Sequence, residues 1–179
     1  MSFKLTLAQR IGEQIASELQ PFCERIEIAG SIRRRSEFVN DIDIVALPKE
    51  GQREALRERC KRNTHVVTDG DQCLIVVLPP FTHHGSRIQD LQVDLWIARR
   101  PEADLLQSKP GNFGSLFLCR TGSKEHNIWL CQRAESLGLR WNPYAGVFDG
   151  HGNCLAWETE EEILRALDLA WIAPENRER

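Results

Sequence analysis

The sequence contains no apolar run near the ~18–20 residues that a membrane-spanning helix requires. Its first residues, Met-Ser-Phe-Lys-Leu-Thr, also lack the apolar core of a secretory signal peptide. These two absences argue against a membrane protein and against an exported one. We therefore expect a cytoplasmic protein with access to the nucleoid or nucleus and with no membrane partner.

The sequence also lacks Cys-x-x-Cys pairs, internal repeats, low-complexity tracts and flexible linkers. Its six cysteines are widely spread, which favours reduced, structural thiols over a disulfide framework or a zinc site. A chain of 179 residues with 41% hydrophobic content has enough apolar material for one domain or two small subdomains. Nothing in it indicates an obligate oligomer, and we expect a monomer.

A strong excess of positive charge is absent as well, since the formal net charge is −3. The distribution is uneven, however. Residues 99–140 carry 7 Lys/Arg against 4 Asp/Glu, whereas residues 141–179 carry 3 against 8. Phosphate binding depends on local basic surface rather than on the total, so a nucleic-acid partner remains compatible with this composition.

Apolar periodicity and turn residues predict an α+β protein with mixed or antiparallel strands. The predicted helices are 5–20, 31–35, 50–62, 102–107, 113–119, 121–137 and 159–167. The predicted strands are 26–28, 41–47, 64–68, 73–78, 89–97, 139–142 and 145–148. The character of the sequence changes after Arg99-Arg100-Pro101, and we divide the chain into subdomains at residues 1–104 and 105–179.

Two aspartates one residue apart lie on the predicted strand 41–47. Asp41 and Asp43 share one face of that strand because side chains alternate, while Ile42 and Ile44 take the other. Asp94 occupies the polar face of a later strand, which an antiparallel sheet could place beside the first. Three clustered carboxylates are suited to two Mg²⁺ ions about 3.5–4 Å apart, with Mn²⁺ as a substitute.

A small-residue turn precedes these aspartates. Gly30 and Ser31 at a helix start offer backbone N–H groups and a hydroxyl to phosphate oxygens. Arg34 could neutralise negative charge on a departing pyrophosphate. Each feature alone is weak, but together they favour metal-assisted nucleotidyl transfer.

The pattern Gly30-Ser31-x-x-Arg34, followed by Asp41-x-Asp43, resembles the core motif of the DNA-polymerase-beta-like nucleotidyltransferases. The run from Thr121 to Asn127 is similar to the thumb motif of family X DNA polymerases. Residues 139–148 and the closing Pro174-Glu175-Asn176-Arg177 resemble further segments of that family. The resemblance implies a palm with helices on one face of its sheet and a small thumb of helices and a β-ribbon.

The resemblance also implies roles for individual residues. Asp41, Asp43 and Asp94 would be the catalytic, metal-binding carboxylates, and Asp94 would assist deprotonation of the primer 3′-hydroxyl. The implied nucleotide-binding residues are Gly30, Ser31, Arg34, Asn40, Arg120, Thr121, Gly122, Ser123 and Asn127. We assign Lys124, Arg140 and Tyr144 to DNA contacts. In relatives the Gly-Ser bond that corresponds to Gly122–Ser123 is cis.

Some positions depart from the family pattern. The aromatic pair that usually precedes Thr-Gly-Ser, and that screens against a ribose 2′-hydroxyl, is Cys119-Arg120 here. Gln92 replaces an arginine two residues before the third aspartate, and Cys131 replaces an arginine that faces the template strand. These departures leave sugar discrimination and template dependence open.

The sequence therefore predicts a DNA-directed DNA polymerase of family X type, acting with dNTPs on gapped or primer-template DNA in repair. A template-independent or RNA-directed nucleotidyltransferase is the alternative within enzymes. A catalytically silent module that binds nucleic acid is the alternative outside them. The three aspartates argue against the silent module, which would not need them.

Overall fold

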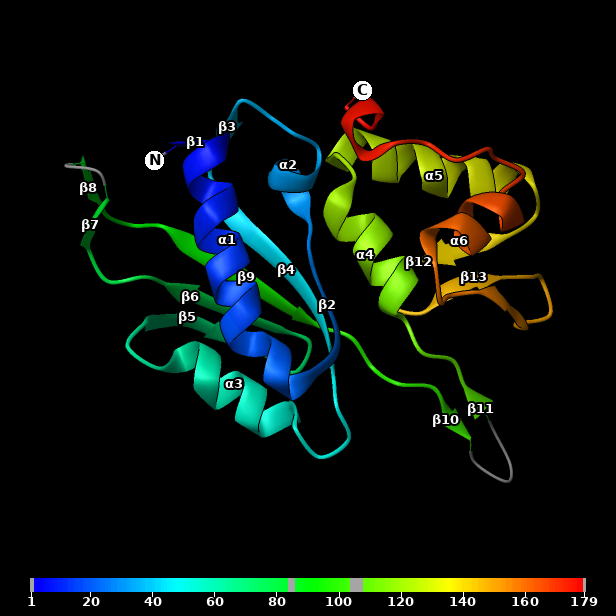
Figure 1. The fold of residues 1–179 in the computed structure, drawn as a ribbon. Helices are drawn as coiled ribbons and strands as arrows, with labels where there is room; N and C mark the ends of the chain where they lie inside the picture. The colour runs from blue at the N-terminus through cyan, green and yellow to red at the C-terminus, as the bar shows by residue number, and fades with distance from the viewer. Residues whose placement is uncertain (1, 84–85, 104–107, 179) are drawn as a thin grey trace. The chain divides into compact units, whose positions relative to one another are not determined.

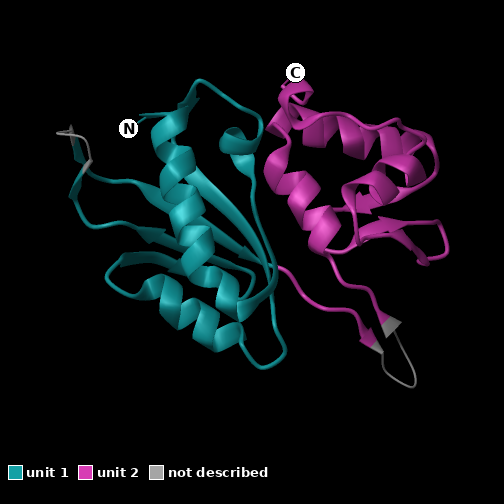
Figure 2. Ribbon diagram, in the orientation of Figure 1, with its two compact units in different colours: residues 1–97 teal, residues 98–179 magenta. Residues whose placement is uncertain are grey.

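The computed structural model, drawn in Figure 1, describes residues 2–83, 86–103 and 108–178. Contacts between Cα atoms divide the chain into two units, Met1–Ile97 and Ala98–Arg179, which Figure 2 distinguishes by colour. The subdomain boundary that we placed between residues 104 and 105 lies outside the described residues. Within the described part, no helix has the length and apolarity to cross a membrane.

The first unit is built on a five-stranded sheet in the order β2-β4-β9-β6-β5. The strands are β2 (Cys23–Ile28), β4 (Asp41–Pro48), β5 (His65–Asp69), β6 (Cys73–Val77) and β9 (Gln92–Ile97). Neighbouring strands are antiparallel except for β4 and β9, which are parallel. Two short ribbons accompany the sheet: β1 (Phe3–Lys4) with β3 (Phe38–Val39), and β7 (Phe81–His83) with β8 (Ser86–Ile88).

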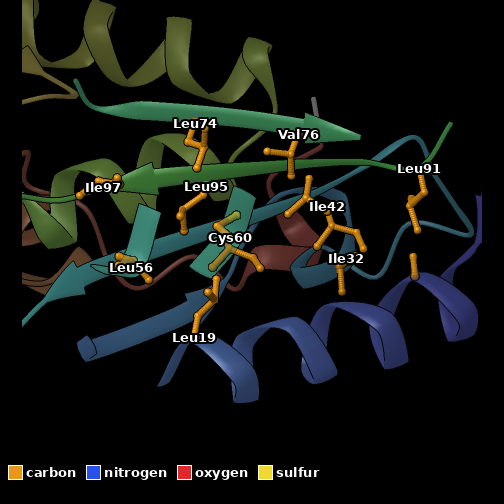
Figure 3. Close-up of a cluster of buried hydrophobic side chains, with 14 of the residues drawn as sticks. Leu19, Ile32, Ile42, Leu56, Cys60, Leu74, Val76, Leu91, Leu95 and Ile97 are labelled. Atoms are coloured by element: carbon orange, nitrogen blue, oxygen red, sulfur yellow. The ribbon is translucent and has the colours of Figure 1, made fainter. Parts of the chain in front are cut away.

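Helices cover one face of this sheet. They are α1 (Leu5–Leu19), α3 (Arg53–Lys61), the single turn α2 (Gly30–Arg33) and the 3-10 turn η1 (Gln20–Phe22). Leu19 of α1 and Leu56 of α3 pack with Ile42, Leu74 and Leu95 of the sheet in the core drawn in Figure 3. Burying each such side chain stabilises the fold by roughly 1.5–3 kcal/mol. The mixed sheet with helices on one face confirms the predicted α+β architecture.

Alternation along β4 and β9 decides which residues enter the core. Ile42 and Ile44 are fully buried, and Val93 and Leu95 are at most 1% exposed. The residues between them, including Asp43 and Asp94, therefore project from the opposite face of the sheet. The core of the first unit thus fixes the face on which the aspartates lie.

The second unit packs three helices with a three-stranded sheet. The helices are α4 (Phe113–Thr121), α5 (Lys124–Ser136) and α6 (Glu160–Ala166), with the 3-10 turn η2 (Pro174–Asn176). The sheet comprises β12 (Arg140–Asn142), β13 (Gly146–Phe148) and β14 (Cys154–Ala156), all antiparallel. Leu118, Leu130, Val147 and Ile163 are fully buried in its core. Trp141, almost buried, donates from its Nε1 to the Ser115 Oγ at 2.9 Å.

Part of the predicted helix 102–107 is wrong. Glu102–Ala103 forms strand β10 and pairs with β11 (Ser108–Lys109), while residues 104–107 lie outside the described part of the chain. The Nζ of Lys109 lies 3.6 Å from an oxygen of Glu102 across this ribbon. The conformation at Glu102 is therefore set by pairing with β11, which the local helix propensity of residues 102–107 does not predict.

The edge strand β5 is tied to helix α3 through Asp69. Lys61 Nζ lies 2.8 Å from the Asp69 Oδ2, Arg57 bonds the Oδ1, and Arg57 also donates to the Gly70 carbonyl at 2.9 Å. The hydrogen bond from Lys61, aided by the charge of Arg57, lowers the pKa of the Asp69 carboxyl below its usual value of 3.8. The ionised form of Asp69 is therefore the one that the folded state favours.

This lowered pKa predicts an acid-sensitive contribution to stability. A carboxyl whose folded pKa is lowered stabilises the fold above its unfolded pKa, and that contribution is lost as pH falls through the folded pKa. Between about pH 5 and about pH 3, the unfolding temperature of Asp69→Asn should fall less than that of the wild type. The exposed Glu50→Gln serves as the control and should follow the wild type. Parallel curves for Asp69→Asn and wild type would contradict the assignment.

Candidate active site

The structure brings Asp43 and Asp94 side by side on neighbouring strands. In the register of β4 against β9, Asp43 lies opposite Asp94, and Asp41 lies opposite Gln92. Asp41 projects from the same face one pleat away from Asp43. The strands are parallel, not antiparallel as the sequence suggested. The chain reaches β9 through α3 and the antiparallel pair β5–β6, and this route returns it in the direction of β4.

Neutral donors from β9 contact both carboxylates. Trp96 donates from its Nε1 to the Asp43 Oδ1 at 3.1 Å, and Gln92 donates from its Nε2 to the Asp94 Oδ1 at 2.7 Å. Asp94 is only 8% exposed. Neighbouring strands lie about 4.8 Å apart. Two ionised carboxylates that face one another across that spacing repel one another. A cation between them would relieve that repulsion.

The turn at Gly30 lies directly against Asp43. The Ala29 amide donates to the Asp43 carbonyl at 2.9 Å, and Gly30 has a left-handed φ of +60°. A Cβ added to Gly30 would lie 2.1 Å from the Asp43 Oδ2, far inside contact distance. Only glycine therefore allows the turn and the carboxylate to occupy this arrangement.

Ser31 supplies an unsatisfied polar atom beside this turn. Its Oγ is buried and makes no hydrogen bond within the described part of the chain. A buried hydroxyl without a partner carries an energetic cost, so a bound group that accepts its hydrogen bond fits this position. Arg34 caps α2 by donating its amide to the Gly30 carbonyl at 3.1 Å, and the exposed Asn40 immediately precedes Asp41.

The three aspartates do not form a closed cage. Within the described ranges, no group of three or more His, Cys, Asp or Glu side chains is gathered closely enough to hold an ion. Mg²⁺ commonly binds through one or two carboxylates plus water and substrate phosphates, rather than in an all-protein cage. The pair Asp43–Asp94, with Asp41 beside it, is compatible with this open mode of binding.

Replacing Gly30 by alanine should damage both the fold and the site. The left-handed conformation costs a non-glycine residue about 1–2 kcal/mol, and the added methyl group would displace the Asp43 carboxylate. Because a misplacement of about 1 Å can cost ~10²-fold in rate, we expect a loss of that order in primer extension.

Gly51→Ala is the matched control for Gly30→Ala. Gly51 has a φ of +71°, but a Cβ there would meet nothing within 4 Å. Thermal unfolding should show that both variants lose stability, whereas primer extension should fall only for Gly30→Ala. Equal activities of the two variants would mean that the contact between Gly30 and Asp43 has no catalytic importance.

In the second unit, the segment Thr121-Gly122-Ser123 joins two helices. Thr121 ends α4 and is fully buried, and Ser123 caps α5 by accepting a hydrogen bond from the His126 amide at 3.1 Å. The Gly122–Ser123 bond is trans, so the cis bond that the resemblance implied is wrong for this structure. Ser123 has φ −70° and ψ 164°, the extended conformation that is typical of an N-cap.

Asn127 points back toward the end of α4. Its Nδ2 donates to the Cys119 carbonyl at 2.8 Å, and its Oδ1 is buried without a hydrogen-bond partner among the described residues. The Asn127 Oδ1 would lie 2.8 Å from a Cβ placed on Gly122. Gly122 therefore leaves room beside an acceptor that has capacity for a ligand donor.

Two of the basic residues assigned to nucleotide and DNA contacts stack on aromatic rings. The Arg120 guanidinium lies 5.5 Å from the centroid of the Tyr144 ring and also hydrogen-bonds the Tyr144 hydroxyl. Arg140 lies 5.5 Å from the centroid of the Phe148 ring, and Lys124 is exposed at the start of α5. Arg120 and Tyr144 are thus one structural pair, which the sequence separated by 24 positions.

Sequence reasoning missed the contribution of Trp96. Its place on the polar face of β9, two residues after Asp94, was the available signal. The alternation of side chains along β9 predicts the face on which Trp96 lies. It does not predict that the indole bonds Asp43, because this contact depends on the side-chain conformation of Trp96. The hydrogen bond to Asp43 identifies Trp96 as part of the site.

Two comparisons with known proteins bear on the class of this chain. Residues 116–178, which lie in the second unit, match the family model described as DNA polymerase beta thumb. The chain is also 30% identical over 180 residues to the DNA polymerase/3′-5′ exonuclease PolX of Bacillus subtilis (strain 168). That alignment covers 98% of this chain and 28% of the relative. Both matches show that the chain is similar to family X DNA polymerases.

Proposed function

We propose that this chain adds dNMP units to a primer 3′-hydroxyl by metal-assisted nucleotidyl transfer, directed by a DNA template. The observation that carries the proposal is the register pairing of Asp43 with Asp94 beside the Gly30–Ser31 turn. Filling of short gaps during repair is the biological task we propose. In this function the substrates are gapped or primer-template DNA and a dNTP, and the protein acts as a monomer.

The residues present fit a divalent ion and a triphosphate. Asp41, Asp43 and Asp94 would hold Mg²⁺, or Mn²⁺ in its place, because carboxylate oxygens are the ligands that these hard cations prefer. When bound, the ion would neutralise charge that develops on the phosphate oxygens. The orphaned Ser31 Oγ supports the placement of a phosphate at the neighbouring turn.

The side chains of the first unit supply positioning and charge neutralisation. The Ser31 hydroxyl and the amides near Gly30 and Asn40 would hold the β- and γ-phosphates, with Arg34 neutralising the departing pyrophosphate. Asp94 would accept the proton of the primer hydroxyl. Phosphoryl transfer needs little more than these contributions, because its barrier is lowered mainly by orientation and electrostatics.

The second unit would contribute the nucleotide pocket and the DNA contacts. Thr121, Gly122 and Ser123 would shape the space for the sugar, and the open acceptor of Asn127 would face the incoming base. Arg120 would join this pocket from its stack on Tyr144. Lys124, Arg140 and Tyr144 would contact DNA, where exposed cations and aromatic rings are effective.

Primer extension tests this function. The substrates are gapped, nicked, blunt and single-stranded DNA, each with Mg²⁺ or Mn²⁺ and one dNTP at a time. Incorporation that follows the template base supports the proposal. DNA binding without any incorporation would refute the proposal and would support a catalytically silent module instead.

A second candidate is template-independent or RNA-directed nucleotidyl transfer. The observation in its favour is that Cys119-Arg120 replaces an aromatic pair and that Arg120 is held against Tyr144. A pocket without that aromatic pair should tolerate a ribose 2′-hydroxyl. Untemplated addition to single-stranded or blunt DNA, or extension on an RNA template, would support this candidate, and strict dependence on a DNA template would count against it. Comparison of dNTP and rNTP incorporation tests the relaxed sugar discrimination alone, and a strong preference for dNTPs would count against that.

A further inference from the structure

Trp96 contacts Asp43 across the two strands on a diagonal. In the register of β4 and β9, Trp96 lies opposite Val45, and Asp94 lies opposite Asp43. The indole therefore extends two residues back along β4, from Val45 to Asp43, to place its Nε1 3.1 Å from the Asp43 Oδ1. Aromatic side chains have the reach for such diagonal contacts.

The two oxygens of Asp43 have different neighbours. The Oδ1 accepts the indole N–H, while the Oδ2 lies against Gly30, where an added Cβ would approach within 2.1 Å. A hydrogen bond on one oxygen and a tight backbone contact on the other restrict rotation of the carboxylate. Asp43 is thus held in one orientation by Trp96 and Gly30 together.

The indole is a particular kind of partner for a metal-binding carboxylate. It donates one hydrogen bond, has no acceptor, and carries no charge at any pH. It can therefore orient Asp43 without competing for the cation that this carboxylate would bind. Groups that orient metal ligands in this way typically change metal affinity by about 10–100-fold when they are removed.

We infer that Trp96 is a positioning residue, whose N–H sets the Asp43 carboxylate for a divalent cation. The inference rests on the proposed function, since it assumes that Asp43 binds the ion. It goes beyond that function by assigning the affinity of the site to a neutral donor on β9. Trp96 is also the only tryptophan among residues 1–97, so it can report on an ion bound nearby.

Two substitutions separate the hydrogen bond from the packing of the ring. Trp96→Phe keeps an aromatic ring and removes the donor. Trp96→His removes the benzene ring of the indole but places Nε2 where the indole Nε1 stands, so an N–H donor can be kept at that position. If packing of the ring sets the affinity for the cation, Trp96→Phe should bind it more tightly than Trp96→His. If the hydrogen bond sets that affinity, Trp96→His should bind it more tightly.

The experiment measures Mn²⁺ binding to the full chain at pH 8 by electron paramagnetic resonance. We expect Trp96→Phe to bind Mn²⁺ about 10–100-fold more weakly than the wild type, and Trp96→His to remain within a few-fold of it. Trp129→Phe is the matched control in the second unit and should leave the affinity unchanged. Excitation of tryptophan should also sensitise Tb³⁺ luminescence more weakly in Trp96→Phe than in the wild type and in Trp129→Phe.

The outcomes distinguish this inference from the proposed function. Equal Mn²⁺ affinity of Trp96→Phe and wild type, or stronger binding by Trp96→Phe than by Trp96→His, would overturn the positioning role alone. Absence of Mn²⁺ binding in the wild type, or unchanged binding in Asp94→Asn, would overturn the metal site itself. Circular dichroism and thermal unfolding without metal establish that each variant is folded. If Trp96→Phe is unfolded, Trp96→His against wild type decides, and a loss beyond a few-fold refutes the inference.

Discussion

Replacing Asp94 by asparagine is expected to abolish the proposed nucleotidyl transfer while leaving the fold intact. Asparagine retains an oxygen that can accept the hydrogen bond from Gln92, but it loses the negative charge that faces Asp43. Single groups that balance charge in phosphoryl transfer contribute about 10³–10⁵-fold, so kcat/KM for primer extension should fall by about 10³-fold or more. Steady-state extension on gapped DNA measures this loss.

Asp94→Asn should lose activity but should not lose stability. Without metal, Asp94→Asn removes repulsion between two carboxylates on adjacent strands, so its unfolding temperature should equal or exceed that of the wild type. Added Mn²⁺ should raise the unfolding temperature of the wild type, since a ligand that binds only the folded state stabilises it. The variant should show a much smaller metal effect.

Asp90→Asn is the control for the loss of one negative charge. Asp90 is exposed just before β9 and has a φ of +57°, a conformation that asparagine adopts as readily as aspartate. Its activity and metal response should match those of the wild type. If Asp94→Asn keeps full activity, the assignment of Asp94 to the metal site is wrong, and the proposed mechanism fails with it.

The alternation of apolar and acidic side chains along β4 shows how much of this site could be predicted from the sequence. The pattern Asp-Ile-Asp-Ile predicted that Ile42 and Ile44 enter the core and that the aspartates take the other face. Both isoleucines are fully buried, which confirms the first part. Side-chain period is a local property of a strand, and it therefore survives whatever partners the strand acquires.

That β9 runs parallel to β4 could not be predicted in the same way. It depends on the path through α3 and the β5–β6 pair, a property of the whole connection rather than of residues 92–97. Strand β14 was missed for a similar reason, since Cys154–Ala156 is short and is defined by its pairing with β13. Elements that exist through tertiary pairing leave only a weak signal in the sequence.

Arg177 illustrates a residue whose motif was visible but whose role was not. The closing pattern Pro174-Glu175-Asn176-Arg177 belonged to the resemblance, which assigned Arg177 no contact. In the structure Arg177 is fully buried and bonds the Ile172 carbonyl through Nε and Nη2 at 3.0 and 2.9 Å. Its guanidinium also lies 5.2 Å from the centroid of the Trp171 ring.

Arg177→Met is therefore expected to destabilise the second unit severely. The Arg177 Nη1 lies 2.6 Å from the Glu160 Oε1, and Glu160 is only 4% exposed at the start of α6. Removing one partner leaves the other charge buried without compensation, at a cost of about 3–5 kcal/mol. For a unit of this size that cost corresponds to a fall of more than about 12 °C in unfolding temperature.

The matched control is Lys109→Met, which breaks an exposed ion pair in the same unit. The side chains of Lys109 and Glu102 are 67% and 66% exposed, so their pairing contributes only about 0–1 kcal/mol. Thermal and urea unfolding, followed by tryptophan fluorescence, compares the two variants. A loss for Arg177→Met no larger than that for Lys109→Met would show that the buried pair does not hold the chain end on α6.

A double substitution separates the pair from the packing around it. Arg177→Met combined with Glu160→Gln removes both charges, so the double variant should be more stable than the sum of the single losses predicts. The recovered part measures the penalty of an unpaired buried charge, and the remainder measures the lost hydrogen bonds to Ile172. Simple additivity of the two single losses would mean that Arg177 and Glu160 act independently, contrary to the 2.6 Å contact between them.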